Sequence, residues 1–184
     1  MTRWDGKRVV MIGAARQGLA LVRHLAENGA SVILNDNRTE DALASSRDQI
    51  ADLDITWVTG GHPLEILDGA DLVCLSGGVP LDLELVKEDV RRGIPLSNDS
   101  QVFLEEAPCP VIGITGSAGK TTTTAMVGEI AREHFALRKP GNQVWVGGNI
   151  GNPLIRDIGK MKADDLAVME LSSFQLEIMT VSPQ

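Results

Sequence analysis

A lysine and a row of threonines follow a glycine-rich turn in the middle of the chain. Residues 111–124 read VIGITGSAGKTTTT, so Lys120 and Thr121 stand directly after the turn that holds Gly116 and Gly119. Glycines let backbone N–H groups curl round phosphate oxygens, and the N-terminus of a following helix adds partial positive charge. A lysine at this place reaches terminal phosphates, and a threonine hydroxyl binds Mg²⁺. The stretch therefore predicts a phosphate-binding site for a nucleotide.

The strict P-loop spacing GxxxxGK[ST] is not met, because it requires glycine at position 114 and the chain has Ile114. The alternative is an ordinary glycine turn, but packing alone does not explain a Gly-Lys-Thr run at a strand-to-helix junction. We expect residues 111–115 to form a buried strand. We expect the following helix to carry one apolar stripe, formed by Met126, Val127, Ile130 and Ala131.

A second glycine turn lies near the N-terminus, where GAARQG at 13–18 follows the apolar run Val9–Ile12. A helical pattern and a second apolar run, Ser31–Leu34, lead to Asp36 and complete a β-α-β unit. The dinucleotide fingerprint GxGxxG fails at Ala15, where a glycine normally lets a pyrophosphate approach the backbone. Three interpretations stay open: phosphate binding at the helix N-terminus, an NAD-dependent oxidoreductase, and a β-α-β unit without a ligand.

The remaining pattern alternates between strand-like and helix-like stretches, which predicts an α/β protein. Before residue 98 we expect further strands at 55–58, 71–75 and 94–97, and helices at 42–53, 64–67 and 83–92. After residue 98 we expect helices at 101–106 and 154–158, strands at 144–146 and 166–169, and a polar turn at 135–142. We therefore predict a Rossmann-like parallel-sheet domain over 1–98 and the start of a P-loop α/β ATPase domain over 99–184.

Two strand ends carry further candidates for a site. The run Leu166–Met169 ends in Glu170, and a carboxylate delivered by an apolar strand is how P-loop enzymes supply a second Mg²⁺ contact. The turn Ser76–Pro80 also follows an apolar run, and open α/β sheets bind ligands at such ends. The alternatives are an exposed glutamate and a plain turn. We interpret His62, in GGHP, as a turn residue.

Composition excludes some partners and compartments. The chain has 17 basic and 25 acidic residues, a net charge of −8, which disfavours a nucleic-acid partner. No stretch reaches the ~18 apolar residues needed to cross a bilayer, and the N-terminus lacks an apolar signal core. Cys74 and Cys109 lack metal-ligand spacing and suit a reducing compartment. We expect a cytoplasmic protein that does not bind a membrane.

Taken together, these motifs resemble the Mur ligase family, ATP-dependent enzymes that add amino acids to peptidoglycan precursors. The resemblance runs along the whole chain and rests on TGSAGKTT at 115–122, GNIG at 148–151, ELSSFQL at 170–176 and DNR at 36–38. It is greatest to the members that add D-glutamate to UDP-N-acetylmuramoyl-L-alanine. It implies that ATP phosphorylates the substrate carboxylate and that the amine of D-glutamate attacks the acyl phosphate.

The resemblance also implies roles for individual residues. Those implied to bind the UDP-linked substrate are Arg16, Gln17, Asp36, Asn37, Arg38, Gly78 and Asn149. Those implied to bind ATP are Gly116, Ser117, Ala118, Gly119, Lys120, Thr121 and Thr122. Thr121 and Glu170 are implied to bind Mg²⁺, and Lys120, Glu170 and Asn149 are implied to be catalytic.

The chain departs from the family pattern in two residues and in length. Ala118 stands where the family usually has a larger, often polar residue, and Gly77 replaces the usual proline. Family members also continue into a longer central domain and a third domain. We therefore expect a monomeric N-terminal part of a ligase that is inactive alone. A non-catalytic nucleotide-binding module is the remaining alternative.

Overall fold

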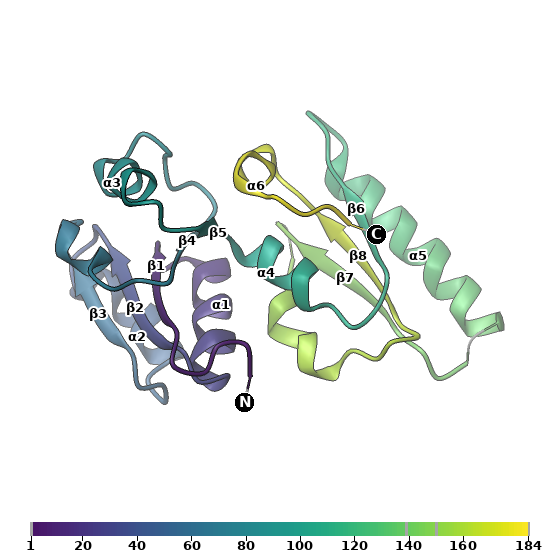
Figure 1. Cartoon of the computed structure of the whole chain (residues 1–184). Helices are drawn as coiled ribbons and strands as arrows, with labels where there is room; N and C mark the ends of the chain where they lie inside the picture. Colours follow the sequence, from purple (N-terminus) through teal and green to yellow (C-terminus); the bar gives the residue numbers. More distant parts are fainter. Residues whose placement is uncertain (1, 139, 150, 184) are drawn as a thin grey trace. The chain divides into compact units, whose positions relative to one another are not determined.

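The chain folds into two compact units that divide between Asp99 and Ser100 (Figure 1). The computed structural model describes residues 2–138, 140–149 and 151–183. The GNIG motif includes Ile150, which lies outside the described residues. Parallel sheets and alternating helices confirm the predicted α/β, Rossmann-like fold class.

The first unit is built on a parallel sheet of five strands in the order β3-β2-β1-β4-β5. The strands are β1 (Arg8–Ile12), β2 (Ser31–Asp36), β3 (Thr56–Thr59), β4 (Leu72–Leu75) and β5 (Leu96–Ser97). The helices are α1 (Arg16–Glu27), α2 (Ala44–Gln49) and α3 (Glu84–Arg92), with 3₁₀ turns η1 (Asp41–Leu43) and η2 (Leu64–Leu67).

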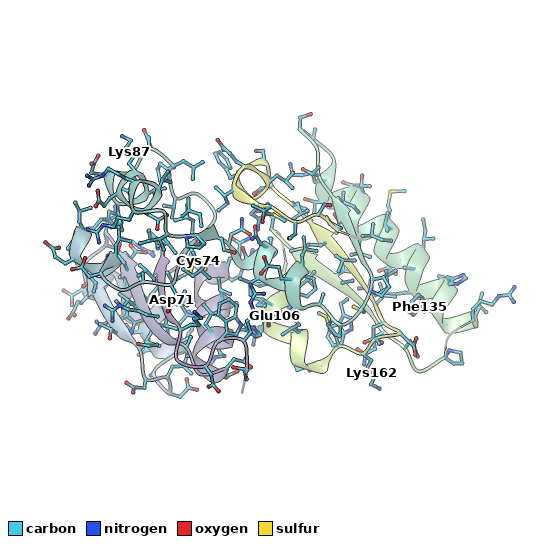
Figure 2. The ribbon with its side chains drawn as sticks, viewed as in Figure 1. Asp71, Cys74, Lys87, Glu106, Phe135 and Lys162 are labelled. Atoms are coloured by element: carbon cyan, nitrogen blue, oxygen red, sulfur yellow. The ribbon has the colours of Figure 1, made fainter. Side chains whose placement is uncertain are left out.

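The apolar runs of the sequence become the core of this unit. Residues 9–11 of the central strand β1 are fully buried, as are Leu21 and Leu25 on the inner face of α1. Cys74, labelled in Figure 2, is fully buried in β4. A parallel sheet covered by helices needs such continuous apolar strands, so the first sheet has the burial that its sequence predicts.

Two elements of the first unit are shorter than predicted. The expected helix over 42–53 is only the six-residue α2 after the turn η1, and α2 buries none of its own side chains. A helix without an apolar face gains little from packing, so its length is limited. The expected strand over 94–97 keeps only the two residues of β5.

The second unit is built on a three-stranded parallel sheet in the order β6-β8-β7. Its strands are β6 (Val111–Ile114), β7 (Val144–Gly148) and β8 (Leu166–Glu170). Its helices are α4 (Asp99–Glu106), α5 (Lys120–Arg138) and α6 (Ser173–Ile178), with the 3₁₀ helix η3 (Leu154–Lys160). The long helix α5 runs along one face of this sheet (Figure 1).

The predicted apolar stripe of α5 is wrong for two of its four residues, while Val127 and Ala131 are half-buried. Met126 is 60% exposed and Ile130 is 68% exposed, whereas α5 buries Thr124, Gly128 and Phe135. Gly128 explains the rotation, because a Cβ there would lie 2.7 Å from a methyl of Val146 in β7, so only glycine lets the helix approach so closely. Phe135, labelled in Figure 2, belongs to the buried face near the end of α5.

Two further predictions in the second unit are wrong. The polar turn expected over 135–142 begins too early, because α5 continues to Arg138. The strand expected to be buried over 111–115 is β6, where Ile112 is 41% exposed and Gly113 is also exposed. An apolar run predicts a strand, but its burial depends on what covers that face of the sheet.

Candidate functional site

The first group of predicted site residues lies at the carboxyl edge of the five-stranded sheet. The strand order places β2 on one side of β1 and β4 on the other, so the chain reverses its winding direction between β1 and β4. Open α/β sheets bind ligands at this point. Gly13 begins the turn after β1 with φ +97°, and a Cβ there would lie 2.8 Å from Ser76 Cβ after β4. The two turns are therefore in contact.

The carboxylate of Asp36 connects the glycine turn to the end of β2. One oxygen accepts the Ala14 backbone N–H at 2.8 Å and Arg38 Nη2 at 2.7 Å. The other accepts Arg38 N–H at 3.0 Å and Nε at 2.9 Å. The hydrogen bonds from Arg38 hold the pKa of Asp36 well below its usual range, although burial opposes the shift.

These four bonds fill the acceptor positions of a carboxylate. Asp36 is only 5% exposed, whereas the Arg38 side chain is 46% exposed. A ligand at this edge therefore meets the Arg38 guanidinium more readily than the Asp36 oxygens. Asn37 and Arg16 are also exposed. Both carry polar side chains that a ligand can reach.

Two buried polar groups beside the glycine turn have no hydrogen-bond partner among the described residues. They are the Nε2 of Gln17, in the first turn of α1, and the Oγ of Ser76, at the end of β4. Gln17 Oε1 lies 3.0 Å from where a Cβ of Gly77 would stand, so the missing side chain at 77 makes room for the amide. Ala15, the N-cap of α1, provides no side-chain acceptor. Unsatisfied donors at a helix N-terminus are suited to an anion.

His62 has a structural partner that its sequence neighbours do not reveal. Its Nδ1 lies 2.6 Å from Oδ1 of Asn35, whose Nδ2 donates to the carbonyls of Val58 and Gly61. With both amide hydrogens donated, Asn35 Oδ1 acts as the acceptor, so His62 Nδ1 carries the proton. The side chains of Asn35 and His62 connect the end of β2 to β3 and to the turn that follows it. This structural contact agrees with the interpretation of His62 as a turn residue.

The second group of predicted residues begins at the loop after β6. Gly116 has φ +151° and Gly119 has φ +76°, so both adopt backbone conformations that favour glycine. Ser117 and Ala118 between them are exposed. Lys120 Nζ donates to the Gly116 carbonyl at 2.8 Å, which folds the lysine back over its own loop. Thr121 and Thr122 are exposed on the first turn of α5.

Glu170 ends β8 between the two other strands of this sheet. The parallel register pairs it with Ile114 of β6 on one side and with Gly148 of β7 on the other. The Asn149 N–H donates to the Glu170 carbonyl at 2.9 Å, and Asn149 Nδ2 lies 3.4 Å from Oε1. The start of the glycine loop, Glu170 and Asn149 therefore meet at one carboxyl edge.

The carboxylate, the glycine loop and the lysine at this edge of the sheet suit a nucleotide with bound magnesium. Glu170 is 1% exposed, and among the described residues its carboxylate accepts one long hydrogen bond, from Asn149 Nδ2 at 3.4 Å. Among the described residues there is no cluster of three His, Cys, Asp or Glu side chains that could hold a metal. Mg²⁺ needs only one or two carboxylates when phosphates complete its shell, and the glycine loop with Lys120 suits those phosphates.

Comparison with known proteins identifies the family. The model for the N-terminal domain of MurD-like Mur ligases matches residues 7–98, and the model for the Mur ligase middle domain matches residues 114–183. The chain belongs to the Mur ligase family. This confirms the resemblance on which the predicted roles depend.

Curated Mur ligases align with nearly the whole chain. It is 40% identical over 171 residues to the UDP-N-acetylmuramoylalanine–D-glutamate ligase of Pelotomaculum thermopropionicum, covering 93% of this chain and 36% of that protein. It is 42% identical to the enzyme of the same name from Geotalea uraniireducens, covering 97% and 38%. The chain thus spans little more than a third of these relatives.

Solved Mur ligases share the fold. A murein peptide ligase from Psychrobacter arcticus is 20% identical, with a TM-score of 0.55, covering 92% of this chain and 39% of that one.

No helix in the described part of the chain combines the length and apolarity that a membrane span requires.

Proposed function

We propose that this Mur ligase chain provides the substrate-binding and ATP-binding parts of a cytoplasmic, monomeric ligase that joins D-glutamate to UDP-N-acetylmuramoyl-L-alanine. The two ligases compared above carry this activity in their names and are about 40% identical to the chain. ATP with Mg²⁺ supplies the phosphoryl group that activates the substrate carboxylate. The amine of D-glutamate then displaces phosphate and forms the amide.

Glu170 supports this proposal most directly. Its carboxylate is buried at the end of β8. The neighbouring strand β6 leads into the glycine loop, which is followed by Lys120 and Thr121. In phosphoryl transfer the protein mainly positions groups and neutralises charge. Lys120 would leave the Gly116 carbonyl to contact the terminal phosphates, and Thr121 and Glu170 would hold Mg²⁺. Asn149, bonded to Glu170 through its backbone, would orient the carboxylate and contact the substrate.

The first unit would bind the UDP part of the substrate. Arg38 and Asn37 would contact the nucleoside, while Asp36 would hold Arg38 and the glycine turn in place. The diphosphate would lie at the N-terminus of α1, where Arg16 offers charge and Gln17 an unpaired N–H group. Gly78 would complete the opposite wall of the site.

The competing function is an NAD-dependent oxidoreductase, which would use the same glycine turn. An acidic residue after β2 usually binds the ribose hydroxyls of NAD, but the oxygens of Asp36 are occupied by Ala14 and Arg38. Ala15 also puts a Cβ where a dinucleotide pyrophosphate requires glycine. Both observations favour a UDP-sugar over NAD.

Calorimetric titration distinguishes the two ligands. We expect UDP-N-acetylmuramoyl-L-alanine to bind the chain and UDP to compete with it. NAD should neither bind with comparable affinity nor displace the UDP-sugar. If NAD bound more tightly than the UDP-sugar, the proposed function of the first unit would be wrong.

A further inference from the structure

The short helix α6 buries a polar residue more completely than any of its apolar residues. Gln175 is its only buried residue and is 2% exposed. The two large apolar side chains beside it, Phe174 and Leu176, are 67% and 38% exposed. These two side chains therefore contribute little to the placement of α6, which depends on the half-buried Ile178 at its end and on hydrogen bonds to Gln175.

Gln175 is the centre of a network that caps α6. Its Oε1 accepts the Ser172 backbone N–H at 2.9 Å, and the Ser172 hydroxyl lies 3.1 Å away. The same hydroxyl accepts the Gln175 N–H at 3.2 Å, which completes a capping box. Ser172 is two residues beyond Glu170, so this cap begins where the candidate metal carboxylate ends β8.

The other end of the Gln175 amide is anchored on α4. Its Nε2 donates to the hydroxyl of Ser100, a fully buried residue, at 2.6 Å. The next residue on α4, Gln101, accepts the Thr180 N–H at 2.9 Å and donates to its hydroxyl at 3.2 Å. The first turn of α4 thus holds the segment after β8 at two points, 75 and 79 residues away along the chain.

We propose that Gln175 is a positioning residue for the magnesium site, acting through Ser172 on the segment that leaves Glu170. This inference rests on the proposed function of Glu170 as a Mg²⁺ ligand. The last ladder bond of β8 runs from Leu171 N–H to the Ile114 carbonyl. Beyond it, the hydrogen bonds that hold the chain include the cap and the bonds to α4, and further along Pro183 lies against Gly113 of β6. Loss of the Gln175 amide loosens this segment, and Glu170 then loses one support of its carboxylate orientation, while the strand pairing and the hydrogen bond from Asn149 remain.

Groups that orient metal ligands without touching the metal typically change metal affinity by ~10- to 100-fold when they are removed. The variant Gln175→Met keeps the length of the side chain and removes its hydrogen bonds. We expect it to weaken Mg²⁺ binding to the complex of the chain with a fluorescent ATP analogue by about tenfold or more. Affinity for the analogue in EDTA should stay within about twofold, because the loop at Lys120 is unchanged.

Two further variants separate positioning from general loss of structure. Ser100→Ala removes the hydrogen bond from Gln175 Nε2 without changing any residue of α6, and we expect a several-fold loss in the same direction with a small fall in melting temperature. Phe174→Ala alters an exposed neighbour on the same helix and should leave Mg²⁺ binding unchanged. If Gln175→Met fails to fold, Ser100→Ala provides the test.

The outcomes are distinct. Absence of any Mg²⁺-dependent binding to the wild-type chain would overturn the proposed function of Glu170, and this inference with it. Normal binding by the wild type together with unchanged Mg²⁺ dependence in folded Gln175→Met, or in Ser100→Ala if Gln175→Met does not fold, would overturn the positioning role alone. A selective loss of Mg²⁺ affinity in these variants, absent from Phe174→Ala, would support it.

Discussion

At the scale of single residues, the pair of Asp36 and Arg38 fastens the glycine turn after β1 to the end of β2. The variant Asp36→Asn removes the charge that holds Arg38 and the Ala14 N–H. We expect the free energy of unfolding at pH 7 to fall by about 2 kcal/mol. This loss is smaller than that expected for a fully buried ion pair, because the Arg38 side chain is half exposed to solvent. Because folding lowers the pKa of Asp36, this stabilisation is complete above its usual value of 3.8 and is lost as the pH falls through its lower folded pKa. Denaturation from pH 3 to 8 measures the difference, which should shrink only below about pH 4.

Asp89 on α3 shows the opposite dependence on pH. It is fully buried, and neither carboxylate oxygen has a hydrogen-bond partner in the described structure. Burial raises its pKa to about 6, so wild-type stability should fall as the pH rises from about 4 to about 6 and then stay level. Asp89→Asn should remove this fall and be more stable at pH 7, by on the order of 1–3 kcal/mol. Denaturant titration at pH 4 and pH 7 measures it.

The matched control for Asp89 is Glu84→Gln, an exposed acid on the same helix. It should leave the pH dependence of stability as in the wild type. Equal pH dependence in the wild type and Asp89→Asn would show that Asp89 is not the group responsible.

Sequence patterns predicted which residues gather at each edge better than what each residue does there. Ile114, Glu170 and Gly148 lie side by side because three parallel strands end at the same edge of the sheet. Apolar runs followed by turns in the sequence predict where those strands end. The sequence could not predict that all acceptor positions of the Asp36 carboxylate are filled. That result depends on a rotamer of Arg38 and on the N–H of Ala14, 22 residues away. The Ser172–Gln175 cap was not predicted, although S-x-x-Q at the start of a helix is the sequence pattern of a capping box.

At the scale of elements, glycines decide how closely the strands and turns of the second unit approach. Gly148 has φ +110°, and a Cβ there would collide with the Glu170 carbonyl. We expect Gly148→Ala to destabilise the second unit by about 2 kcal/mol or more, from backbone strain and from displacement of β8. The control Gly159→Ala has no atom within 4 Å of its new Cβ and should change little. Thermal melting of both variants measures the difference, and equal melting temperatures would contradict it.

The elements themselves were largely predictable, while their lengths and buried faces were not. Apolar runs located every strand, but α5 turned a different face to the sheet because Gly128 fits against Val146. Which face of α5 packs on the sheet depends on Val146 in another element, so the periodicity of the helix alone cannot predict it. The end of α5 was misplaced for a similar reason, since Phe135 is buried in a stretch whose polar neighbours indicated a turn.

At the scale of the whole molecule, the two units differ in how much apolar surface they cover. Among the described residues, large apolar side chains that are exposed lie mainly after residue 99. They are Ile112, Met126, Ile130, Leu137, Phe174 and Leu176, against Val90 alone before it. Fewer buried apolar contacts give less protection against local opening. Hydrogen exchange should therefore be slow in β1 and β4 and faster in β6. Equal protection of these strands would show that the three-stranded sheet is as stable as the five-stranded one.

We propose that one chain binds a UDP-sugar through its first unit and magnesium ATP through its second. A crossed titration tests it, with UDP-N-acetylmuramoyl-L-alanine and ATP–Mg²⁺ each titrated into the wild type, Arg38→Gln and Lys120→Ala. Each variant removes hydrogen bonds to a charged group worth ~1.5–3 kcal/mol, so its own ligand should bind about 10- to 100-fold more weakly. The other ligand should bind as it does to the wild type. Arg47→Gln, a half-exposed arginine that pairs with Glu40, is the control and should change neither affinity. If Arg38→Gln left UDP-sugar binding intact, or Lys120→Ala left ATP binding intact, that assignment would be contradicted.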